Sequence, residues 1–359
     1  MKKRRRPVTG SSLIAFFCDD SSETQTGTQS MLAFALLTQV SWNRTDLADA
    51  NGNSSCLLSA LLHLEAMPTL WNTRSCRRNF IESGVLTTVL MGIPAAQAQE
   101  GRSFHLALLS DTHIPADKSN AYRGFRPWEN LKRVIPEVLA GKPESALING
   151  DAARLTGEVE DYQELKKLLE PLADHCPVSI GLGNHDHRDN FQQVMQPATE
   201  NKPAIEDKHV VVMEHPSVRI VQLDSLLYVD KVAGLLGQDQ RTWLEQFLKE
   251  ADDRSIVFFV HHTLGEGDGD LLDTDRFFQI LKPHRQVKAI FYGHSHVYEY
   301  GFREGKHLIN LPAVGYNFSD AQPVGWLDAR FHRKGVDLTL HATGGNKADD
   351  GKTTSLKWG

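Results

Sequence analysis

Short apolar runs alternate with amphipathic stretches over residues 104–342 of the chain. A continuous apolar run such as 104–110 (FHLALLS) is typical of a strand that is covered on both faces. From Pro127 to Gly141, apolar residues recur every three or four positions, which predicts an amphipathic helix with proline in its first turn. Further strands are expected at 146–150, 177–182, 217–224, 255–260, 287–293, 307–312 and 336–341, and further helices around 165–172 and 243–248. This order of elements predicts an α/β fold.

Five of the expected strands are followed at once by polar residues. These are Asp111 and His113, Asp151, Asn184 and His185, His261 and His262, and His294 and His296. In open α/β sheets, ligands bind outside the carboxyl ends of the strands, so five separate loops can converge there. We therefore expect one site that is built from all five loops.

The chemistry of these side chains points to metal ions. Carboxylate, imidazole and amide groups without thiolates suit Mn, Fe or Zn. One divalent or mixed-valence ion could take Asp111, His113 and His296, and a second could take Asn184, His261 and His294, with Asp151 between them. Two ions roughly 3.5–4 Å apart activate a shared hydroxide and stabilise an in-line displacement at phosphorus. The pattern predicts a metal-dependent phosphoric ester hydrolase.

The segments SDTHI, NGD, GNHDHR, VHH and YGHSH follow one another in this order. They resemble the motif set of the calcineurin-like metallophosphoesterase superfamily over residues 104 to about 342. The resemblance implies a four-layer α/β/β/α sandwich with its metal site at the carboxyl ends of the strands. It also implies that Asn184 binds metal, that His185 lies beside the substrate phosphate as a catalytic residue, and that Asp186 orients His185.

Two details of the motifs bear on the site. In VHH, Thr263 stands where relatives commonly have proline, and either His261 or His262 could be the ligand; we expect His261. Arg188 completes a GNHDxR pattern, which, with the helix around Trp243, looks most like the class III cyclic-nucleotide phosphodiesterase branch. We therefore expect hydrolysis of a phosphodiester by a metal-bridging hydroxide, with Arg188 binding the substrate. A phosphomonoesterase of acid-phosphatase type and a non-catalytic scaffold of this fold remain the alternatives.

The first hundred residues do not continue the α/β pattern. Arginines at 74, 77 and 78, a mildly apolar stretch and the sequence Ala96-Gln97-Ala98 have the layout of a signal peptide. The arginine pair resembles a twin-arginine export signal, which predicts a periplasmic or extracellular location; a buried hydrophobic helix is the other interpretation. We expect residues 1–66 to be unstructured or untranslated, with a start at Met67, a signal at 67–98, the phosphoesterase domain at 99–342 and a flexible tail at 343–359.

Composition limits the partners. The chain has 359 residues with 40% hydrophobic content, a formal net charge of −6 and a pI near 6.2. It lacks the basic field that nucleic-acid binding favours, and we expect neither a nucleic-acid partner nor a stable membrane anchor. A small phosphoester is the expected partner. The acidic stretch 265–275 misses the EF-hand spacing and is expected to be a solvated loop beside the site.

Overall fold

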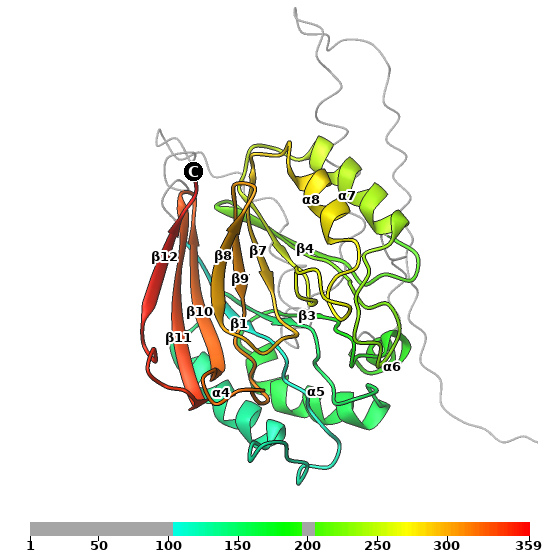
Figure 1. Ribbon diagram of the computed structural model, residues 1–359. Helices are drawn as coiled ribbons and strands as arrows, with labels where there is room; N and C mark the ends of the chain where they lie inside the picture. The colour runs from blue at the N-terminus through cyan, green and yellow to red at the C-terminus, as the bar shows by residue number, and fades with distance from the viewer. Residues whose placement is uncertain (1–102, 196–204) are drawn as a thin grey trace, which may run out of the picture. The chain divides into compact units, whose positions relative to one another are not determined.

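The computed structural model describes residues 103–195 and 205–359, and these form two stacked six-stranded sheets with helices outside each (Figure 1). The first sheet has the order β12-β11-β10-β1-β2-β3 and the second β4-β5-β6-β7-β9-β8. Between them lies a core of apolar side chains from both sheets, among them Leu106, Phe259 and Phe291. This arrangement is the expected α/β/β/α sandwich.

The strands of the first sheet are β1 (Phe104–Leu109), β2 (Ser145–Asn149), β3 (Val178–Gly181), β10 (Pro323–His332), β11 (Gly335–Gly345) and β12 (Thr353–Lys357). Those of the second are β4 (Val211–His215), β5 (Val218–Gln222), β6 (Ile256–Phe259), β7 (Val287–Tyr292), β8 (Glu299–Arg303) and β9 (Lys306–Asn310). β1, β2 and β3 run parallel, as do β5, β6, β7 and β9. The carboxyl ends of each parallel set therefore meet at one edge of its sheet.

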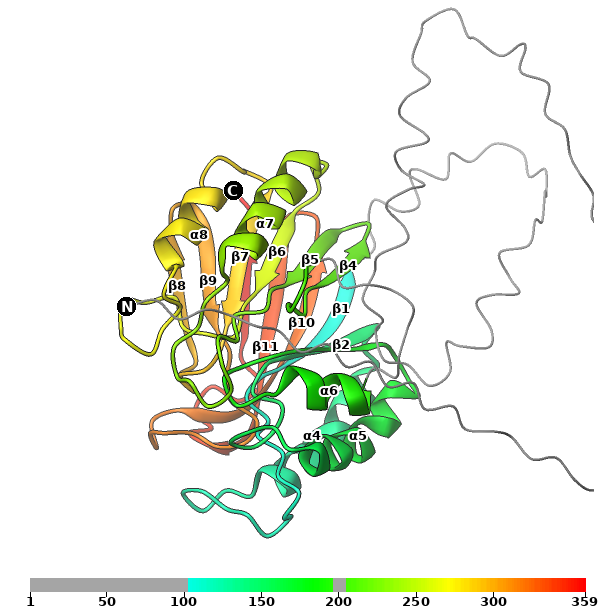
Figure 2. The same cartoon turned by 90° about the vertical axis from the view of Figure 1, so that its right-hand side faces the viewer.

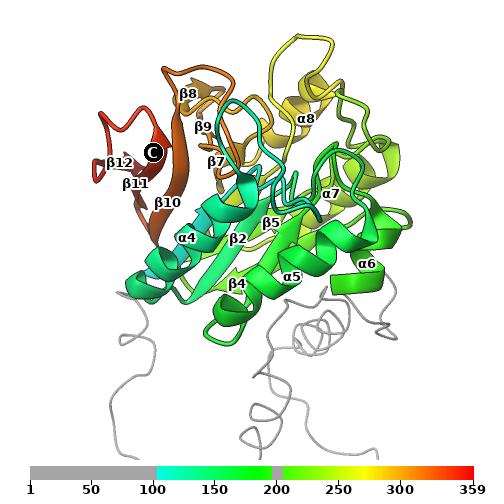
Figure 3. The ribbon, with the colours of Figure 1, turned by 90° about the horizontal axis from the view of Figure 1, so that it is seen from below.

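Helices α4 (Pro127–Gly141), α5 (Val159–Ala173) and α6 (Arg188–Met195) cover the first sheet, and α7 (Gln238–Glu250) and α8 (Thr274–Leu281) cover the second. Figure 2 shows α7 and α8 over the second sheet, and Figure 3 shows α4, α5 and α6 side by side over the first. Each helix buries one apolar stripe; in α4 this includes Leu131, Val134 and Val138. Pro136 lies inside α4 without ending it.

The expectation of a flexible tail at 343–359 is wrong. Residues 353–357 form β12, which pairs antiparallel with β11 from Gly335↔Lys357 to Thr339↔Thr353. Its alternation of exposed and half-buried residues is that of an edge strand with one face against the protein. The expected extension at 1–66 and signal at 67–98 lie outside the described residues. No helix among those described is long and apolar enough to cross a bilayer.

Candidate metal centre

The loops after β1, β2, β3, β6 and β7 meet between the two sheets, as the pattern of polar residues predicts. A hydrogen bond across the sheets fixes two of them, because the backbone N–H of His294 donates to Asp111 Oδ1 at 3.1 Å. A second joins the loops after β2 and β3, where the backbone N–H of His185 donates to Asp151 Oδ1 at 2.9 Å. The side chains at the strand ends are thus brought together by the backbone itself.

Five residues of these loops have a backbone conformation that side chains disfavour. Asp111, His113, Asp151, His294 and His296 have φ between 46° and 70°. Each left-handed residue that is not glycine costs about 1–3 kcal/mol and persists only where the surroundings impose it. Such strain is concentrated at functional sites. Here it turns the side chains inward, out of the strand direction.

The inward-turned side chains form groups that could hold a cation. In the first group, His296 Nε2 lies 3.3 Å from Asp111 Oδ1 and 3.1 Å from His113 Nε2. In the second, His261 Nε2 lies 3.3 Å from Asp151 Oδ1, with His294 beside them. Within each group the possible ligand atoms lie within 4.8 Å of one another, which is the spacing of atoms around one ion.

Asp151 links the two groups through its two carboxylate oxygens. Oδ1 is the atom near His261, while Oδ2 lies 3.7 Å from His113 Nε2. A carboxylate placed between two sets of nitrogen and oxygen atoms can bind one cation with each oxygen. The geometry matches the expected bridging position of Asp151.

Buried polar atoms without partners support the fit to metal. Among the described residues, Asn184 Oδ1 is buried without a partner, and His261 Nε2 is buried with no hydrogen bond besides its 3.3 Å contact to Asp151 Oδ1. Leaving a buried polar atom unpaired costs about 1–3 kcal/mol. Both atoms are ligand types that Mn, Fe and Zn accept. Asn184 also lines the same cavity as His113, Asp151 and His294, so its oxygen has a cation position within reach.

Electrostatics inside the site favour ionised carboxylates. Burial alone would raise the pKa of Asp111, but His296 and His261 outweigh it and hold that pKa at about 2. Burial would lower the pKa of His261, but Asp151 reverses this and raises it to about 9. In the metal-free protein the carboxylates therefore carry their charge, and one imidazole holds the proton that a cation would replace.

Hydrogen bonds from outside the site orient the imidazoles. His261 Nδ1 pairs with the Asn149 carbonyl at 2.9 Å, and His296 Nδ1 pairs with the Tyr316 carbonyl at 2.6 Å. In each case Nε2 is left for the cation. His262 is turned elsewhere, with its Nδ1 2.7 Å from Ser225 Oγ. Of the two adjacent histidines, His261 is the one in the cluster.

Glycine is required next to the bridging carboxylate. A side chain at Gly183 would place its Cβ 2.2 Å from Asp151 Oδ1, and one at Gly150 would place it 2.7 Å from His261 Nδ1. Gly150 also has φ +87°. The glycines of NGD and GNHD therefore let two loops approach the site closely enough to share it.

The expected partnership of His185 and Asp186 is wrong. His185 lines the cavity, and its Nδ1 lies 2.7 Å from the Leu155 carbonyl and 3.7 Å from Asp230 Oδ1. Asp186 is fully buried and points the other way. Adjacent residues in this turn project to opposite sides, so Leu155 and Asp230 orient the imidazole instead.

Asp186 connects the loops behind the site. Oδ2 accepts from the backbone N–H groups of Ala152 at 3.1 Å and Gly183 at 2.8 Å, and Oδ1 accepts from Ala153 at 3.0 Å and from the Tyr162 hydroxyl at 3.0 Å. Burial, followed by the charge of Asp151, raises the pKa of Asp186 to about 6. Asp186 thus fixes the positions of Ala152 and Gly183, which are the chain neighbours of the candidate ligands Asp151 and Asn184.

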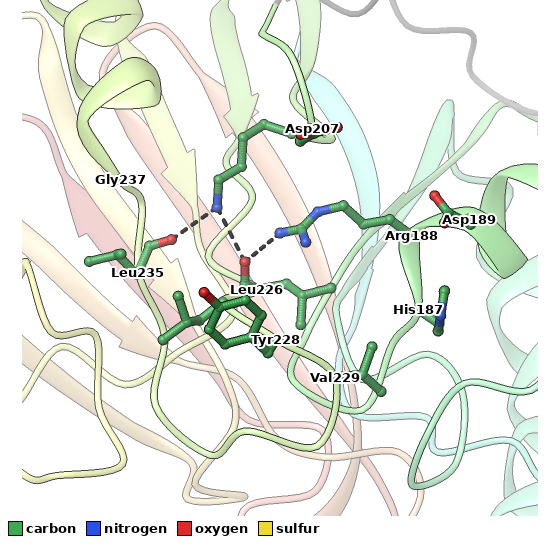
Figure 4. A pocket seen from close by; sticks show the side chains of 11 residues that line it. His187, Arg188, Asp189, Asp207, Leu226, Tyr228, Val229, Leu235 and Gly237 are labelled. Carbon is green, nitrogen blue, oxygen red and sulfur yellow. Dashed lines mark hydrogen bonds between the residues drawn. The ribbon is translucent and has the colours of Figure 1, made fainter. Parts of the chain in front are cut away.

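Arg188 does not face the metal cluster, contrary to the expectation of a substrate-binding role. Its Nε and Nη2 bind both carboxylate oxygens of the buried Asp224 at 2.8 and 2.9 Å. Figure 4 shows Arg188 directed at the Leu226 carbonyl in a separate cavity, and Lys208 Nζ donates to the same carbonyl at 3.2 Å. A guanidinium committed to a buried carboxylate in this way anchors the segment that follows β5.

Comparison with known proteins identifies the family. A sequence model described as calcineurin-like phosphoesterase matches residues 104–298, more than half of the chain, and the match includes every loop of the metal cluster. The chain belongs to the calcineurin-like phosphoesterase family. It is thus a metal-dependent phosphoester hydrolase of a family that uses two metal ions.

Among related phosphoesterases, the 3′,5′-cyclic adenosine monophosphate phosphodiesterase CpdA of Pseudomonas aeruginosa is 30% identical over 199 residues, 53% of this chain and 69% of that protein. A probable cyclic nucleotide phosphodiesterase of Synechococcus is 26% identical over 239 residues, 64% of this chain and 88% of that protein. A probable glycerophosphodiester phosphodiesterase GpdQ of Arcobacter nitrofigilis is 28% identical over 198 residues, 52% and 70% of the two chains. This agrees with the class III resemblance.

Two solved phosphatase structures share the fold. A dimetal phosphatase from Danio rerio aligns with a TM-score of 0.56 at 13% identity, over 71% of this chain and 99% of that one. A purple acid phosphatase from yellow lupin seeds aligns with a TM-score of 0.55 at 17% identity, over 72% and 54%. At these identities the likeness establishes the architecture alone.

Sequence reasoning missed several residues around the phosphoesterase site. Phe318 and Val232 line its cavity of about 370 Å³ without belonging to any motif. Tyr316 packs its ring against His113, at 4.8 Å between centroids and 24° between planes. These residues lie in loops that have no periodic pattern, so only the folded structure could find them. The acidic loop expected beside the site does lie there, since Gly269 and Asp270 line the same cavity.

Proposed function

We propose that this chain hydrolyses a phosphodiester at two cations held between its sheets. The ligands are Asp111, His113, His296 and Asp151 for one ion, and Asp151, Asn184, His261 and His294 for the other. The observation that carries the proposal is the position of Asp151. Its Oδ1 lies near His261 of one ligand group and its Oδ2 lies near His113 of the other. The relatives named as cyclic nucleotide and glycerophosphodiester phosphodiesterases favour a diester over a monoester.

Bound cations would lower the pKa of a water molecule and neutralise charge on the phosphate. The donor set of carboxylate, imidazole and amide suits Mn, Fe or Zn. The chain's own residues position this chemistry: Asp111 and Asp151 supply the negative charge, and the hydrogen bonds to Asn149 and Tyr316 fix the direction of two imidazoles. The site is preorganised, because these contacts form before any substrate arrives.

His185 is placed to transfer a proton to the leaving oxygen. It lines the cavity, and its ring centroid is 5.4 Å from that of His113. Nδ1–H donates to the Leu155 carbonyl, so Nε2 is the nitrogen that can meet the substrate. As an imidazolium, His185 would give its Nε2 proton to the leaving oxygen. The other proton would stay on Nδ1, hydrogen-bonded to the Leu155 carbonyl. Asp230 Oδ1 lies 3.7 Å from Nδ1.

Hydrolysis of two chromogenic esters tests this function. We expect the manganese-loaded protein to hydrolyse bis-p-nitrophenyl phosphate with a higher kcat/KM than p-nitrophenyl phosphate, and to lose both activities after chelation. A preference for p-nitrophenyl phosphate would instead assign a phosphomonoesterase. No turnover of either ester by the metal-loaded protein would assign a non-catalytic scaffold.

We also infer that the protein is exported by its twin-arginine-type segment. Support comes from the sequence of 74–98, in which paired arginines precede a mildly apolar stretch and a small-x-small site. Amino-terminal sequencing of the native protein should begin at Gln99. A start within residues 1–60 would contradict both the cleavage and the internal start at Met67.

A further inference from the structure

Two apolar side chains stand exposed in the wall of a cavity that is otherwise polar. Phe318 and Val232 both line the metal cavity, together with imidazoles, carboxylates, an amide and hydroxyl groups. Phe318 is 51% exposed and Val232 is 57% exposed. Both side chains thus leave apolar surface open to the cavity, and a ligand that covers this surface gains free energy.

The two side chains reach the cavity from different segments of the chain. The ring of Phe318 stacks on His296, at 4.2 Å between centroids and 17° between planes, which places it at the Asp111 group. Val232 belongs to the segment after β5 and lies against the loop after β6, where a Cβ at Gly269 would come within 2.9 Å of its Cγ1. Phe318 and Val232 therefore offer apolar surface to the cavity from two separate segments of the chain.

Phe318 is held in place before any ligand binds. Tyr316 packs beside both rings, with its ring centroid 5.8 Å from that of Phe318 and 4.8 Å from that of His296. Tyr122, from the loop after β1, lies 6.3 Å from Phe318 edge to face. An aromatic ring that is already fixed loses little entropy when a ligand packs on it. The wall is thus suited to bind a flat or bulky apolar group.

We propose that Phe318 and Val232 are specificity-determining residues that each pack on one ester substituent of the substrate. The preferred substrate class is then a phosphodiester with a bulky apolar or aromatic group on each side of the phosphorus, and diesters with small or polyhydroxylic substituents are poorer substrates. This rests on the proposed function, since a monoester has only one substituent to place.

Phosphodiesters with one shared leaving group test this selection. Bis-p-nitrophenyl phosphate and methyl p-nitrophenyl phosphate both release p-nitrophenolate and differ only in the group that stays. We expect the wild type to favour the bis-aryl ester by at least tenfold in kcat/KM. Phe318→Ala and Val232→Ala should each lower kcat/KM for the bis-aryl ester by about tenfold, mainly through KM.

The ratio of the two esters separates the roles of the two residues. The alanine variant of the residue that packs on the retained group should show a smaller ratio of kcat/KM between the bis-aryl and the methyl ester. The alanine variant of the residue that packs on the leaving group should lower kcat/KM for both esters equally. Phe302→Ala is the matched control, because Phe302 is 66% exposed on β8 and does not line the cavity. Phe302→Ala should leave kcat/KM unchanged for both esters.

Two outcomes would overturn the inference. One is a wild type that hydrolyses the bis-aryl ester while both cavity variants behave like Phe302→Ala. The other is a Phe318→Ala protein that has lost bound metal and activity on both esters in proportion, since this would make Phe318 a support for His296 only. If the metal-loaded wild type hydrolyses neither ester, the proposed function itself fails, and this result is distinct from both.

Discussion

Replacing the buried carboxylate of Asp186 by alanine should disturb both the fold and the metal site. Its oxygens accept hydrogen bonds from the backbone N–H groups of Ala152, Ala153 and Gly183 and from the Tyr162 hydroxyl. The side chain is fully buried, so water does not reach these donors. In Asp186→Ala, all four would lose their acceptor.

The size of the effect follows from these four groups. An unsatisfied buried donor costs about 1–3 kcal/mol. Taking the low end for each donor, Asp186→Ala lowers the free energy of unfolding by about 4 kcal/mol. A change of this size in a large domain corresponds to a fall of roughly 10 °C in Tm. Because Gly183 precedes Asn184 and Ala152 follows Asp151, metal content and kcat should fall as well.

Denaturant unfolding followed by tryptophan fluorescence, with metal analysis of the same samples, measures both effects. Asp275→Ala is the control, since Asp275 pairs with Arg303 at 2.8 Å on the surface and exposed ion pairs contribute about 0–1 kcal/mol. If Asp186→Ala unfolded within 1 kcal/mol of that control and kept its full metal content, the role given to Asp186 would be refuted.

Four further predictions follow from single side chains. In the metal-free protein, burial, followed by the charge of Asp151, raises the pKa of Asp186 to about 6, above its unfolded value of 3.8. The free energy of unfolding should therefore fall as pH rises from 3.8 to about 6, because the folded protein holds this proton more tightly than the unfolded chain. Asp186→Asn, which has no such proton, should gain about 2 kcal/mol relative to wild type between about pH 4.5 and pH 7.5, and an equal difference at both pH values in urea unfolding would contradict this. His185→Ala should keep its metal, measured by elemental analysis, but lose about 10²–10⁴-fold in kcat; metal loss would contradict the proton-transfer role. Asp151 raises the pKa of His261 to about 9, and a cation that binds His261 must displace the imidazole proton. The affinity for Mn²⁺, measured by calorimetry, should therefore rise with pH up to about 9. An affinity that does not change with pH would show that His261 is not a ligand. Arg188→Met should destabilise the fold by about 3 kcal/mol, because the buried carboxylate of Asp224 would lose its closest charged partner and keep the Lys208 ammonium at 3.9 Å. KM for the diester should stay unchanged; a higher KM with unchanged stability would instead assign Arg188 to substrate binding.

The pattern of the sequence predicts the layers of the fold and the meeting of the loops. Apolar runs that end in polar residues identified β1, β2, β3, β6 and β7, because a strand buried on both faces must be apolar and its end need not be. The same argument places Asp111, Asp151, Asn184 and His294 at the carboxyl ends of their strands, where loops of the two sheets meet. These predictions depend only on local pattern and on the direction of parallel strands.

What the sequence could not predict depends on side-chain direction and on packing between loops. Asp186 and Arg188 stand next to His185 in one short motif, yet one points into the loops behind the site and the other to Asp224. The expected flexible tail contains the strand β12, which is ordered by pairing with β11. Phe318 stacks on His296 from a loop without pattern. Each outcome is decided by a distant partner.

Anomalous diffraction from crystals of the manganese-loaded protein tests the central claim most directly. The account predicts two peaks about 3.5–4 Å apart, one in contact with Asp111, His113 and His296, the other with Asn184, His261 and His294, and Asp151 touching both. A single peak, or a pair at any other place in the molecule, would contradict it.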